Sequence, residues 1–367
     1  MEDEESCVYL AICDVPEEEE GYWPKGVGIY PDDRGPIQST QGNDQMAQAQ
    51  ENLVVPSYSE LVSEQLALVE LFVRAGINFV FLPNASKEAR RKFKLTHDRE
   101  FLCDPSHTGP NGEVYTFNMG AEWRKTEALY QAEVTKVLGV ETIVQQGGDP
   151  NEGGNIRWFK DPVGQVWYVG AVSKRSTHRA HVDLAKAMGV PEIRTVIVEV
   201  DDALHLDCAF MPHTDENKVV LATHLPAFTS ESRGKFRQLG ADLNAEILEL
   251  TEKDKNNLAT NRVQVGNVTL GGFVYEQMET ALREAFPRMT FLEAKQKIRT
   301  FLLGGSINCL SRQYFFKEPI DIDALNKRAK ASGLFGPGGL TNGEVIYFQD
   351  RVQGVAFPNF QNLALAA

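Results

Sequence analysis

The stretch HRAHVDLAKAMGVPEIRTVIVEV, residues 178–200, holds the unit on which the fold prediction rests. Its first part has the apolar spacing of an amphipathic helix that reaches Met188, and Gly189 is the residue expected just after the last helical turn. Residues 190–200 are rich in Val and Ile and predict a short buried strand. The stretch is therefore predicted to form a helix, a turn and a strand.

The same order of helix, turn and strand recurs along the chain with a period of about 50 residues. A segment that predicts a further strand stands before most copies. The other copies are residues 61–82, 127–144, 232–250 and 275–292, with Gly76, Gly139, Gly240 and Pro287 at the turns, and the preceding strands are predicted at 100–104, 155–159, 204–210 and 262–270. Five ββαβ-type units of this kind can close into a ring, and they argue against one doubly wound sheet.

Length and composition limit the classes of protein and partner. The chain has 367 residues, of which 42% are hydrophobic and 24% are charged, as in an ordinary globular protein. Its formal net charge of -14 disfavours a nucleic acid or an anionic membrane as partner. Its five cysteines include no CxxC pair, which argues against a disulfide framework and a structural zinc site.

The two ends of the chain lie outside the repeat. Residues 14–52 show no clear periodicity and predict either a partly disordered surface insertion or a lid over a cleft. The predicted organisation is a strand plus this insertion in residues 1–53, the repeat domain in 54–315, and a C-terminal extension in 316–367 that begins with a helix at 321–332. The acidic first residues lack the features of a secretory signal, no apolar run is long enough to span a bilayer, and a cytoplasmic location is predicted.

Gly333–Gly339 is rich in glycine and proline but lacks the GxxxxGK[ST] pattern of a phosphate-binding loop. We expect a turn region at this point, and no cofactor is predicted.

Polar residues inside the predicted first strands are the candidates for chemistry, because a polar group in an apolar strand needs a partner or a function. If the units close into a ring, these strands meet at its centre. The candidates are Asp104 in the second unit, Glu152 and Asn155 in the third, His205 and Asp207 in the fourth, and Asn261 and Cys309 in the fifth, the last within GGSINCLSRQ at 304–313.

A thiol, an imidazole and a carboxylate form the set of nucleophile, acid/base and orienting group used in covalent catalysis. Asp104 and Asp207 could together bind a planar cation such as a guanidinium. Structural roles remain open for the same residues: Cys309 as a small buried apolar residue, Asp104 as a turn cap before Pro105, His205 as a core histidine. A metal site of His205, Cys208 and His213 is a further alternative, although alternation along a strand disfavours it.

The ordered set Asp104-Pro105, Glu152-Gly153-Gly154, His205-Leu206-Asp207 and Gly304-Gly305…Cys309-Leu310-Ser311 resembles the guanidino-group-modifying superfamily of the pentein fold. That superfamily includes arginine deiminase, agmatine deiminase, dimethylargininase and the amidinotransferases. Residues 173–176 and 203–206 are most similar to dimethylargininase, and 305–311 to the deiminases. The resemblance covers residues 54–313 and implies a five-bladed α/β propeller with approximate fivefold symmetry.

The resemblance also implies roles for individual residues. Cys309 would be the nucleophile, His205 the general acid and base, and Glu152 the carboxylate that holds His205. Asp104 and Asp207 would bind the guanidinium nitrogens. Arg124 and Arg175 are candidates to hold a substrate α-carboxylate.

The implied activity is a cysteine-dependent hydrolase of arginine or an N-substituted arginine, which acts through a thiouronium adduct on Cys309 and releases ammonia or an amine. An amidinotransferase shares the same catalytic residues and is the alternative. A non-catalytic pentein-fold binding protein is a third reading, disfavoured because such proteins lack the nucleophile and the histidine. The implied partner is a small guanidino compound, and the resemblance leaves a homo-oligomer open.

Two departures from the superfamily pattern bear on the substrate. Asn155 stands where deiminases and dimethylargininases usually carry Asp. Agmatine deiminases also lack that Asp. The first strand lacks the arginine common in arginine-type members. The identity of the guanidino compound is therefore left open.

Overall fold

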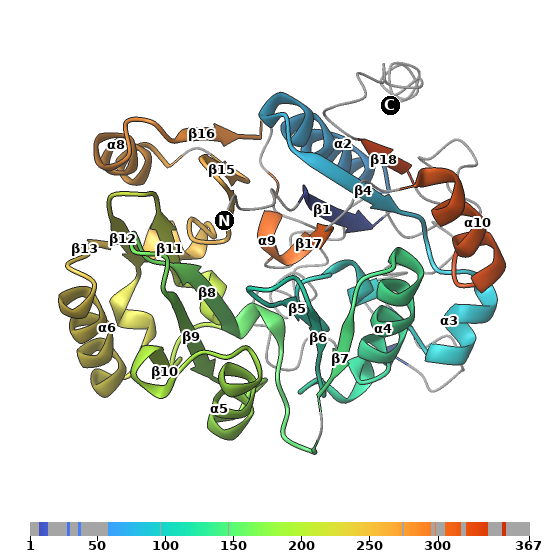
Figure 1. Ribbon diagram of the computed structural model, residues 1–367, viewed down its shortest axis with the longest axis horizontal. Coiled ribbons are helices and arrows are strands. Elements are labelled where there is room, and N and C mark those ends of the chain that lie inside the picture. Colours follow the sequence, from blue (N-terminus) through green and yellow to red (C-terminus); the bar gives the residue numbers. More distant parts are fainter. Residues whose placement is uncertain are drawn as a thin grey trace.

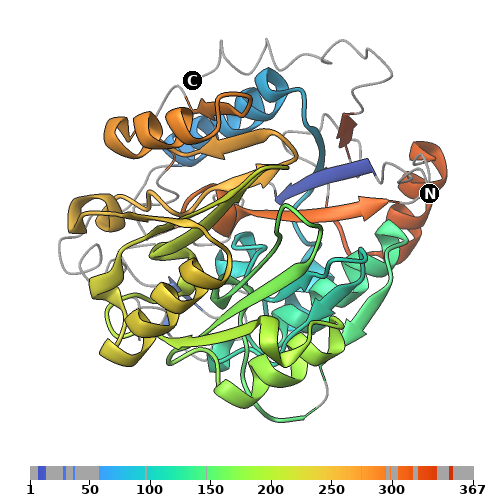
Figure 2. The same ribbon diagram turned by 60° about the vertical axis from the view of Figure 1, so that its left-hand side comes forward.

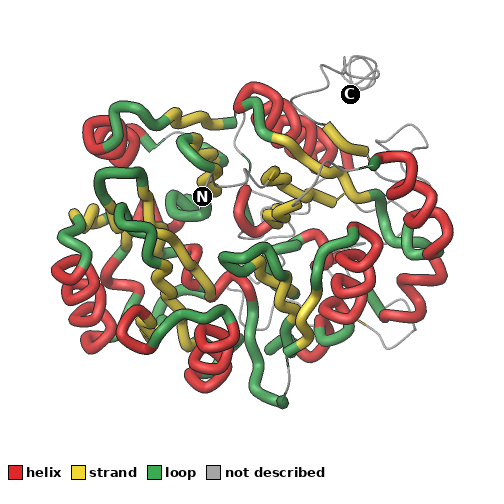
Figure 3. The backbone as a smooth tube through the Cα atoms, viewed as in Figure 1, coloured by secondary structure: helices red, strands yellow, loops and turns green. Residues whose placement is uncertain are grey.

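The computed structural model describes residues 7–13, 28–29, 36–37, 58–95, 97–145, 147–273, 275–294, 298, 305–316, 321–336 and 347–349. Five sheets of three or four strands lie around a common centre in these residues, and the longer helices cover the outside of the ring (Figure 1). Figure 3 shows the same division, with strands toward the centre and helices at the rim. The predicted five-bladed α/β propeller is confirmed.

The first blade is assembled from both ends of the chain. Strand β1 (Cys7–Cys13) pairs in parallel with β4 (Asn78–Leu82), and the helix α2 (Tyr58–Ala75) connects them. On its other side β1 pairs antiparallel with β17 (Ser311–Phe316), as Figure 2 shows. Strand β18 (Tyr347–Gln349) pairs antiparallel with β4 at the edge. One sheet therefore contains strands from all three predicted segments. The predicted division of the chain into 1–53, 54–315 and 316–367 stays a prediction.

Each of the other blades has one antiparallel strand pair, then a helix, then a strand that returns in parallel. The second has β5 (Ser106–Thr108), β6 (Val114–Thr116), α4 (Glu127–Leu138) and β7 (Thr142–Val144); the third β8 (Ile156–Lys160), β9 (Val166–Val172), α5 (His178–Ala187) and β10 (Thr195–Glu199); the fourth β11 (Phe210–Thr214), β12 (Val219–Thr223), α6 (Ser230–Asp242) and β13 (Glu246–Glu249); the fifth β14 (Val263–Val265), β15 (Val268–Gly271), α8 (Glu276–Ala285) and β16 (Thr290–Glu293).

Shorter elements join or flank the blades, and the predicted helix at 321–332 is confirmed. In the described ranges the remaining α-helices are α3 (Lys87–Phe93), α7 (Glu252–Asn256), α9 (Ile307–Leu310) and α10 (Ile322–Ser332). Strand β2 (Gly28–Ile29) pairs with β3 (Pro36–Ile37) inside the predicted insertion. Among the described helices, none combines the length and the hydropathy needed to cross a bilayer.

The predicted first strands at 100–104 and 204–210 are wrong. Residues 97–100 and 206–208 form 3-10 turns instead, and the strands start later, at Ser106 and Phe210. Short polar side chains and proline favour local turns over an extended ladder, which is why these segments do not pair as strands. The candidate residues therefore lie on the turns that lead into the inner strands.

The turn glycines behave largely as predicted. Gly76, Gly139 and Gly189 have positive φ angles of 63°, 81° and 72°. Gly240 is the exception, because α6 continues to Asp242 and Asn244 takes the left-handed conformation with φ 47°. Asparagine tolerates that conformation better than most residues, so it can replace glycine there.

The core lies between the sheets and the outer helices. Leu68 and Phe72 on one face of α2 pack with Phe79 of β4, and the two phenyl rings are 5.9 Å apart. The same cluster contains Leu270 of the fifth blade. Shared apolar clusters of this kind hold neighbouring blades together and position the inner strands.

Burial of His213 on β11 predicts a pH-dependent stability. Its side chain is fully buried, and neither ring nitrogen has a hydrogen-bond partner among the described residues. Burial, with the charges of Arg262 and Arg157, lowers the pKa of His213 to about 3. An unfolded histidine titrates near 6.5, so the unfolded chain takes up a proton that the folded chain refuses. Acidification from about pH 6.5 downward therefore favours unfolding.

For His213→Leu we expect a weaker pH dependence. A single such histidine removes about 2 kcal/mol from the free energy of unfolding between pH 7 and pH 5, and leucine cannot take up the proton. Urea unfolding of both proteins at pH 7 and pH 5 gives the loss of unfolding free energy in each, and the two losses are compared. An identical loss in the variant would show that His213 does not carry the effect.

Candidate active site

The predicted nucleophile lies at the centre of the ring. Cys309 belongs to the short helix α9, directly before β17, and is 5% exposed. The amide of Asn261 fixes this segment: its oxygen accepts hydrogen bonds from the backbone N–H groups of Asn308 (3.0 Å) and Cys309 (3.2 Å). The Asn261 Nδ2 donates to Cys309 Sγ at 3.0 Å. One side chain of the fifth blade thus sets both the backbone and the thiol.

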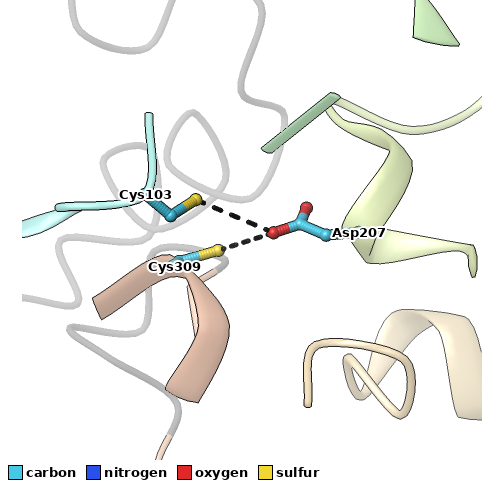
Figure 4. A group of neighbouring side chains, drawn as sticks. All are labelled: Cys103, Asp207 and Cys309. Atoms are coloured by element: carbon cyan, nitrogen blue, oxygen red, sulfur yellow. Dashed lines mark hydrogen bonds between the residues drawn. The ribbon is translucent and has the colours of Figure 1, made fainter. Parts of the chain in front are cut away.

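A carboxylate from the fourth blade faces this thiol. Asp207 Oδ2 lies 3.5 Å from Cys309 Sγ and 4.0 Å from Cys103 Sγ and faces both sulfurs (Figure 4). The same oxygen accepts from the side-chain amides of Asn261 (3.0 Å) and Asn308 (2.8 Å). Among the described residues, Asp207 thus accepts from two amide groups and has no basic side chain within 4.0 Å.

The surroundings keep the thiol protonated when the site holds no cation. A hydrogen bond with Cys103 lowers the pKa of Cys309, but burial and the carboxylates of Asp207 and Asp104 outweigh it and raise the pKa above its ordinary value. A cation bound between the two carboxylates would remove much of their effect. The site is therefore arranged so that a cationic ligand favours the thiolate, the nucleophilic form.

A buried acid/base pair lies beside the thiol cluster. His205 Nε2 is 2.8 Å from Glu152 Oε2, and both side chains are almost fully buried. The other oxygen of Glu152 accepts from the backbone N–H groups of Gly120 and Ala121 at 3.1 and 3.3 Å. Arg175 Nη1 lies 3.2 Å from that same oxygen. The carboxylate is thereby held in one orientation toward the imidazole.

Charges around His205 favour its protonated form. Burial lowers the pKa of His205, but the carboxylates of Asp104, Glu152 and Asp207 together raise it above its ordinary value. Burial raises the pKa of Glu152, and Arg175 and His205 lower it by more. Both shifts favour an imidazolium beside a carboxylate, an arrangement that suits proton donation.

The two residues after Glu152 must be glycine for steric reasons. A Cβ on Gly153 would lie 1.9 Å from the backbone oxygen of Cys103, and a Cβ on Gly154 would lie 2.6 Å from His205 Nδ1. Only glycine lets the third blade approach both segments this closely.

Both predicted carboxylate-binding arginines belong to the site, but both are engaged by its own acids. Arg124 Nη1 lies 2.6 Å from Asp104 Oδ2, and Arg124 Nη2 lies 2.8 Å from Glu127 Oε2. Arg175 pairs with Glu152. This pairing favours a positioning role for the two guanidinium groups, and their predicted contact with a substrate carboxylate stays a prediction.

The seven predicted site residues thus come together from the second, third and fourth blades and from α9, directly before β17. Sequence reasoning missed the part played by four neighbours. Cys103 and Asn308 are adjacent to predicted residues in the sequence, and this adjacency could have indicated them. Arg157 and Arg312 lie on β8 and β17, and no sequence pattern pointed to them.

Two groups in the described part of the chain could hold a metal ion. The ligand atoms of Cys103, Asp207 and Cys309 lie within 4.8 Å of one another, and so do those of Asp104, Glu152 and His205. Thiolates and a carboxylate suit a soft divalent ion such as Zn²⁺.

The alternative metal site of His205, Cys208 and His213 is wrong. His205 turns toward Glu152, Cys208 toward Asp207 at 3.5 Å, and His213 toward the ring of Phe291.

Comparison with known proteins places this site in a family. The family model described as "N,N dimethylarginine dimethylhydrolase, eukaryotic" matches residues 32–316, well over half of the chain. No curated protein sequence matches.

Several solved structures share the fold. AgrE with ornithine and NAD+ has a TM-score of 0.61 at 19% identity over 85% of this chain. The substrate-bound N-terminal domain of ArgZ, an arginine dihydrolase from the ornithine-ammonia cycle in cyanobacteria, has 0.58 at 18% over 83% of this chain and 97% of its own. A dimethylarginine dimethylaminohydrolase adduct with 4-chloro-2-hydroxymethylpyridine has 0.54 at 16% over 83% and 99%. The chain spans only 40% of AgrE. The pentein fold predicted from the motifs is thereby confirmed.

Proposed function

Because the chain belongs to the eukaryotic N,N-dimethylarginine dimethylhydrolase family, we propose that it is a cysteine-dependent hydrolase of an N-substituted arginine or of arginine itself. The observation that carries the proposal is the pair of contacts at the ring centre: Asp207 at 3.5 Å from the Cys309 thiol, and Glu152 at 2.8 Å from His205. They supply a nucleophile, a cation-binding carboxylate and an oriented acid in one buried site.

Binding prepares the nucleophile. The guanidinium of the substrate is held by Asp207 and Asp104, and its charge offsets the carboxylates that raise the pKa of Cys309. The cation lowers the pKa of the thiol, which releases its proton to solvent, so substrate binding and activation are coupled. An empty site consequently has a weakly reactive thiol.

The first chemical step forms the Cys309 adduct. The thiolate adds to the guanidinium carbon, the C–N bond to the departing nitrogen breaks, and His205 gives that nitrogen its proton. The raised pKa of His205 supports this acid role. An amine leaves from an N-substituted arginine and ammonia from arginine, and a thiouronium group remains on the sulfur.

The second step is hydrolysis of that group. Water adds to the thiouronium carbon, His205 takes a proton from it, and the C–S bond breaks. Cys309 is regenerated, and the product is the urea corresponding to the substrate, citrulline in the case of an arginine. Glu152 keeps His205 oriented in both steps.

Product analysis by mass spectrometry tests the proposal. Arginine, monomethylarginine, N,N-dimethylarginine, agmatine and guanidinoacetate are each incubated with the protein, with and without an amine acceptor such as glycine. We expect citrulline and the matching amine from one of the arginines, and none from Cys309→Ala. Ornithine with an amidinated acceptor would identify a transferase instead, and turnover by Cys309→Ala would overturn the assigned nucleophile.

A further inference from the structure

A channel enters the ring centre along the inner strands. It has a volume of about 630 Å³ and opens between exposed residues such as Pro162 and Glu216. Every blade contributes its innermost strand to the wall: His107 from β5, Arg157 from β8, Thr214 from β11, Gln264 from β14 and Arg312 from β17. Cys103 and Asn308, next to the thiol cluster, lie at its inner end.

One buried guanidinium in this wall has a free edge. Arg157 is only 8% exposed, and its Nη1 donates to Asn308 Oδ1 at 2.7 Å. Its Nε and Nη2 have no hydrogen-bond partner among the described residues. These two N–H groups point the same way on the planar guanidinium, so together they match the two oxygens of one carboxylate or phosphate group.

A second buried guanidinium completes the wall beside it. Arg312 is 4% exposed, its Nη2 donates to the backbone oxygens of Leu102 and Cys103, and its Nη1 contacts His107 Nδ1 at 3.3 Å. Its Nε has no partner in the described part of the chain. Arg157 and Arg312 also repel each other. The pKa of Arg312 is lowered mainly by burial, and the charge of Arg157 lowers it further.

Neither charge is balanced by an acid. Within the described ranges no carboxylate lies within 4.0 Å of Arg157 or Arg312, whereas the equally buried Arg262 has Glu279 at 3.0 Å and Glu293 at 3.6 Å. Burial and the two arginines lower the pKa of His107 well below its ordinary value, so His107 is neutral. Water could satisfy the open N–H groups but could not neutralise two buried charges, which are costly when unpaired.

We propose that a small oxyanion, a carboxylate or a phosphate group, binds at the inner end of this channel. It takes the Nε and Nη2 of Arg157 in a bidentate contact and the Nε of Arg312 as a third donor. The site is separate from the guanidinium-binding carboxylates and needs a ligand of the opposite charge.

A short chain of hydrogen bonds joins this site to the proposed reaction centre. Arg157 donates to Asn308 Oδ1, and Asn308 Nδ2 donates to Asp207 Oδ2 at 2.8 Å. An oxyanion that fixes Arg157 therefore also fixes the amide that orients Asp207. We therefore expect a lower KM when an oxyanion fills the channel. This expectation rests on the proposed function, whereas binding of the oxyanion does not.

Anion titrations of the folded protein test binding without using activity. Sodium formate and sodium phosphate are added at constant ionic strength, and binding is followed by calorimetry and by the rise of Tm, because a ligand of the folded state stabilises it. Three proteins are compared: the unaltered chain, Arg157→Met, and Lys160→Met as a matched control. Lys160 lines the same channel but is exposed.

We expect saturable binding of one oxyanion per chain, weakened at least about tenfold in Arg157→Met and unchanged in Lys160→Met. With no oxyanion present, Arg157→Met should be at least as stable as the unaltered chain, because it removes an unbalanced buried charge. Should Arg157→Met fail to fold, Arg157→Lys keeps a charge but not the paired edge and should also bind more weakly.

Three results would overturn the proposal: no saturable binding of formate or phosphate by the unaltered chain, equal binding by Arg157→Met, or binding of chloride alone. The hydrolase assignment is unaffected by each of them, since it depends on product analysis. Phosphate without formate binding would identify a phosphate group as the ligand, and the reverse a carboxylate.

Discussion

Cys309→Ser is expected to lower turnover at least about 10⁴-fold while the fold stays intact, because a buried hydroxyl does not ionise near neutral pH as a cation-activated thiol does. The substitution changes one atom in a segment held by Asn261, so the backbone hydrogen bonds at 3.0 and 3.2 Å should persist. Steady-state kinetics with the substrate found by product analysis gives the size of the loss. Circular dichroism and Tm check the fold.

The second thiol in the cluster supplies a matched control for this experiment. Cys103 lies beside Cys309, with its Sγ 4.0 Å from Asp207 Oδ2, and is also buried. Its pKa is raised well above the ordinary value, first by its hydrogen bond with Cys309 and then by burial. Cys103→Ser should retain turnover that is easily measured. If Cys103→Ser abolished turnover and Cys309→Ser did not, the nucleophile would be Cys103.

Glu152→Gln is expected to lower kcat by about 10³- to 10⁴-fold, as loss of the orienting carboxylate does in other triads. Glu152 is among the acids that raise the pKa of His205 against burial. Without it less charge opposes the effect of burial, so the pKa of His205 falls and a smaller fraction of His205 is protonated at a given pH. The activity that depends on protonated His205 should consequently be lost at a lower pH than in the unaltered chain.

The pH profile of kcat and an NMR titration of His205 measure this effect. Glu127→Gln is the matched control, since Glu127 is another buried acid of the site but pairs with Arg124. A small effect on the profile is expected there. An unchanged His205 pKa in Glu152→Gln would remove Glu152 from the proposed role.

Much of the fold is encoded in short-range patterns, and these could be read from the sequence. Helix α4 has the predicted bounds, and the glycines 76, 139 and 189 take the left-handed conformation. Periodicity reports burial on one face of an element, so it predicts where a helix packs. It fails near Asp104 and Asp207, where the predicted strands are turns and the carboxylates bond to side chains from elsewhere in the chain.

The site could be predicted as a set of residues but not as a set of contacts. The order of the motifs indicated five residues, and similarity to dimethylargininase indicated Arg124 and Arg175. The structure places all seven close together, while their roles stay predictions. The pairing of Arg124 with Asp104 and of Arg175 with Glu152 depends on how neighbouring blades meet, which no local pattern records. Strand β18 was not predicted for another reason. Its three residues are too few to show the alternation of apolar and polar residues that indicates a strand.

The pairing of β1 with β17 has a consequence for biosynthesis. Six residue pairs, from Cys7 with Phe316 to Ile12 with Ser311, join the start of the described chain to a segment some 300 residues later. Contacts so distant in sequence form late, since a long loop must close first. Cys309 lies two residues before this strand, so a nascent chain still lacking it has four blades and lacks the proposed nucleophile of the central cluster. Under the proposed function, the chain therefore gains its activity only after Cys309 and β17 have been made and have joined β1.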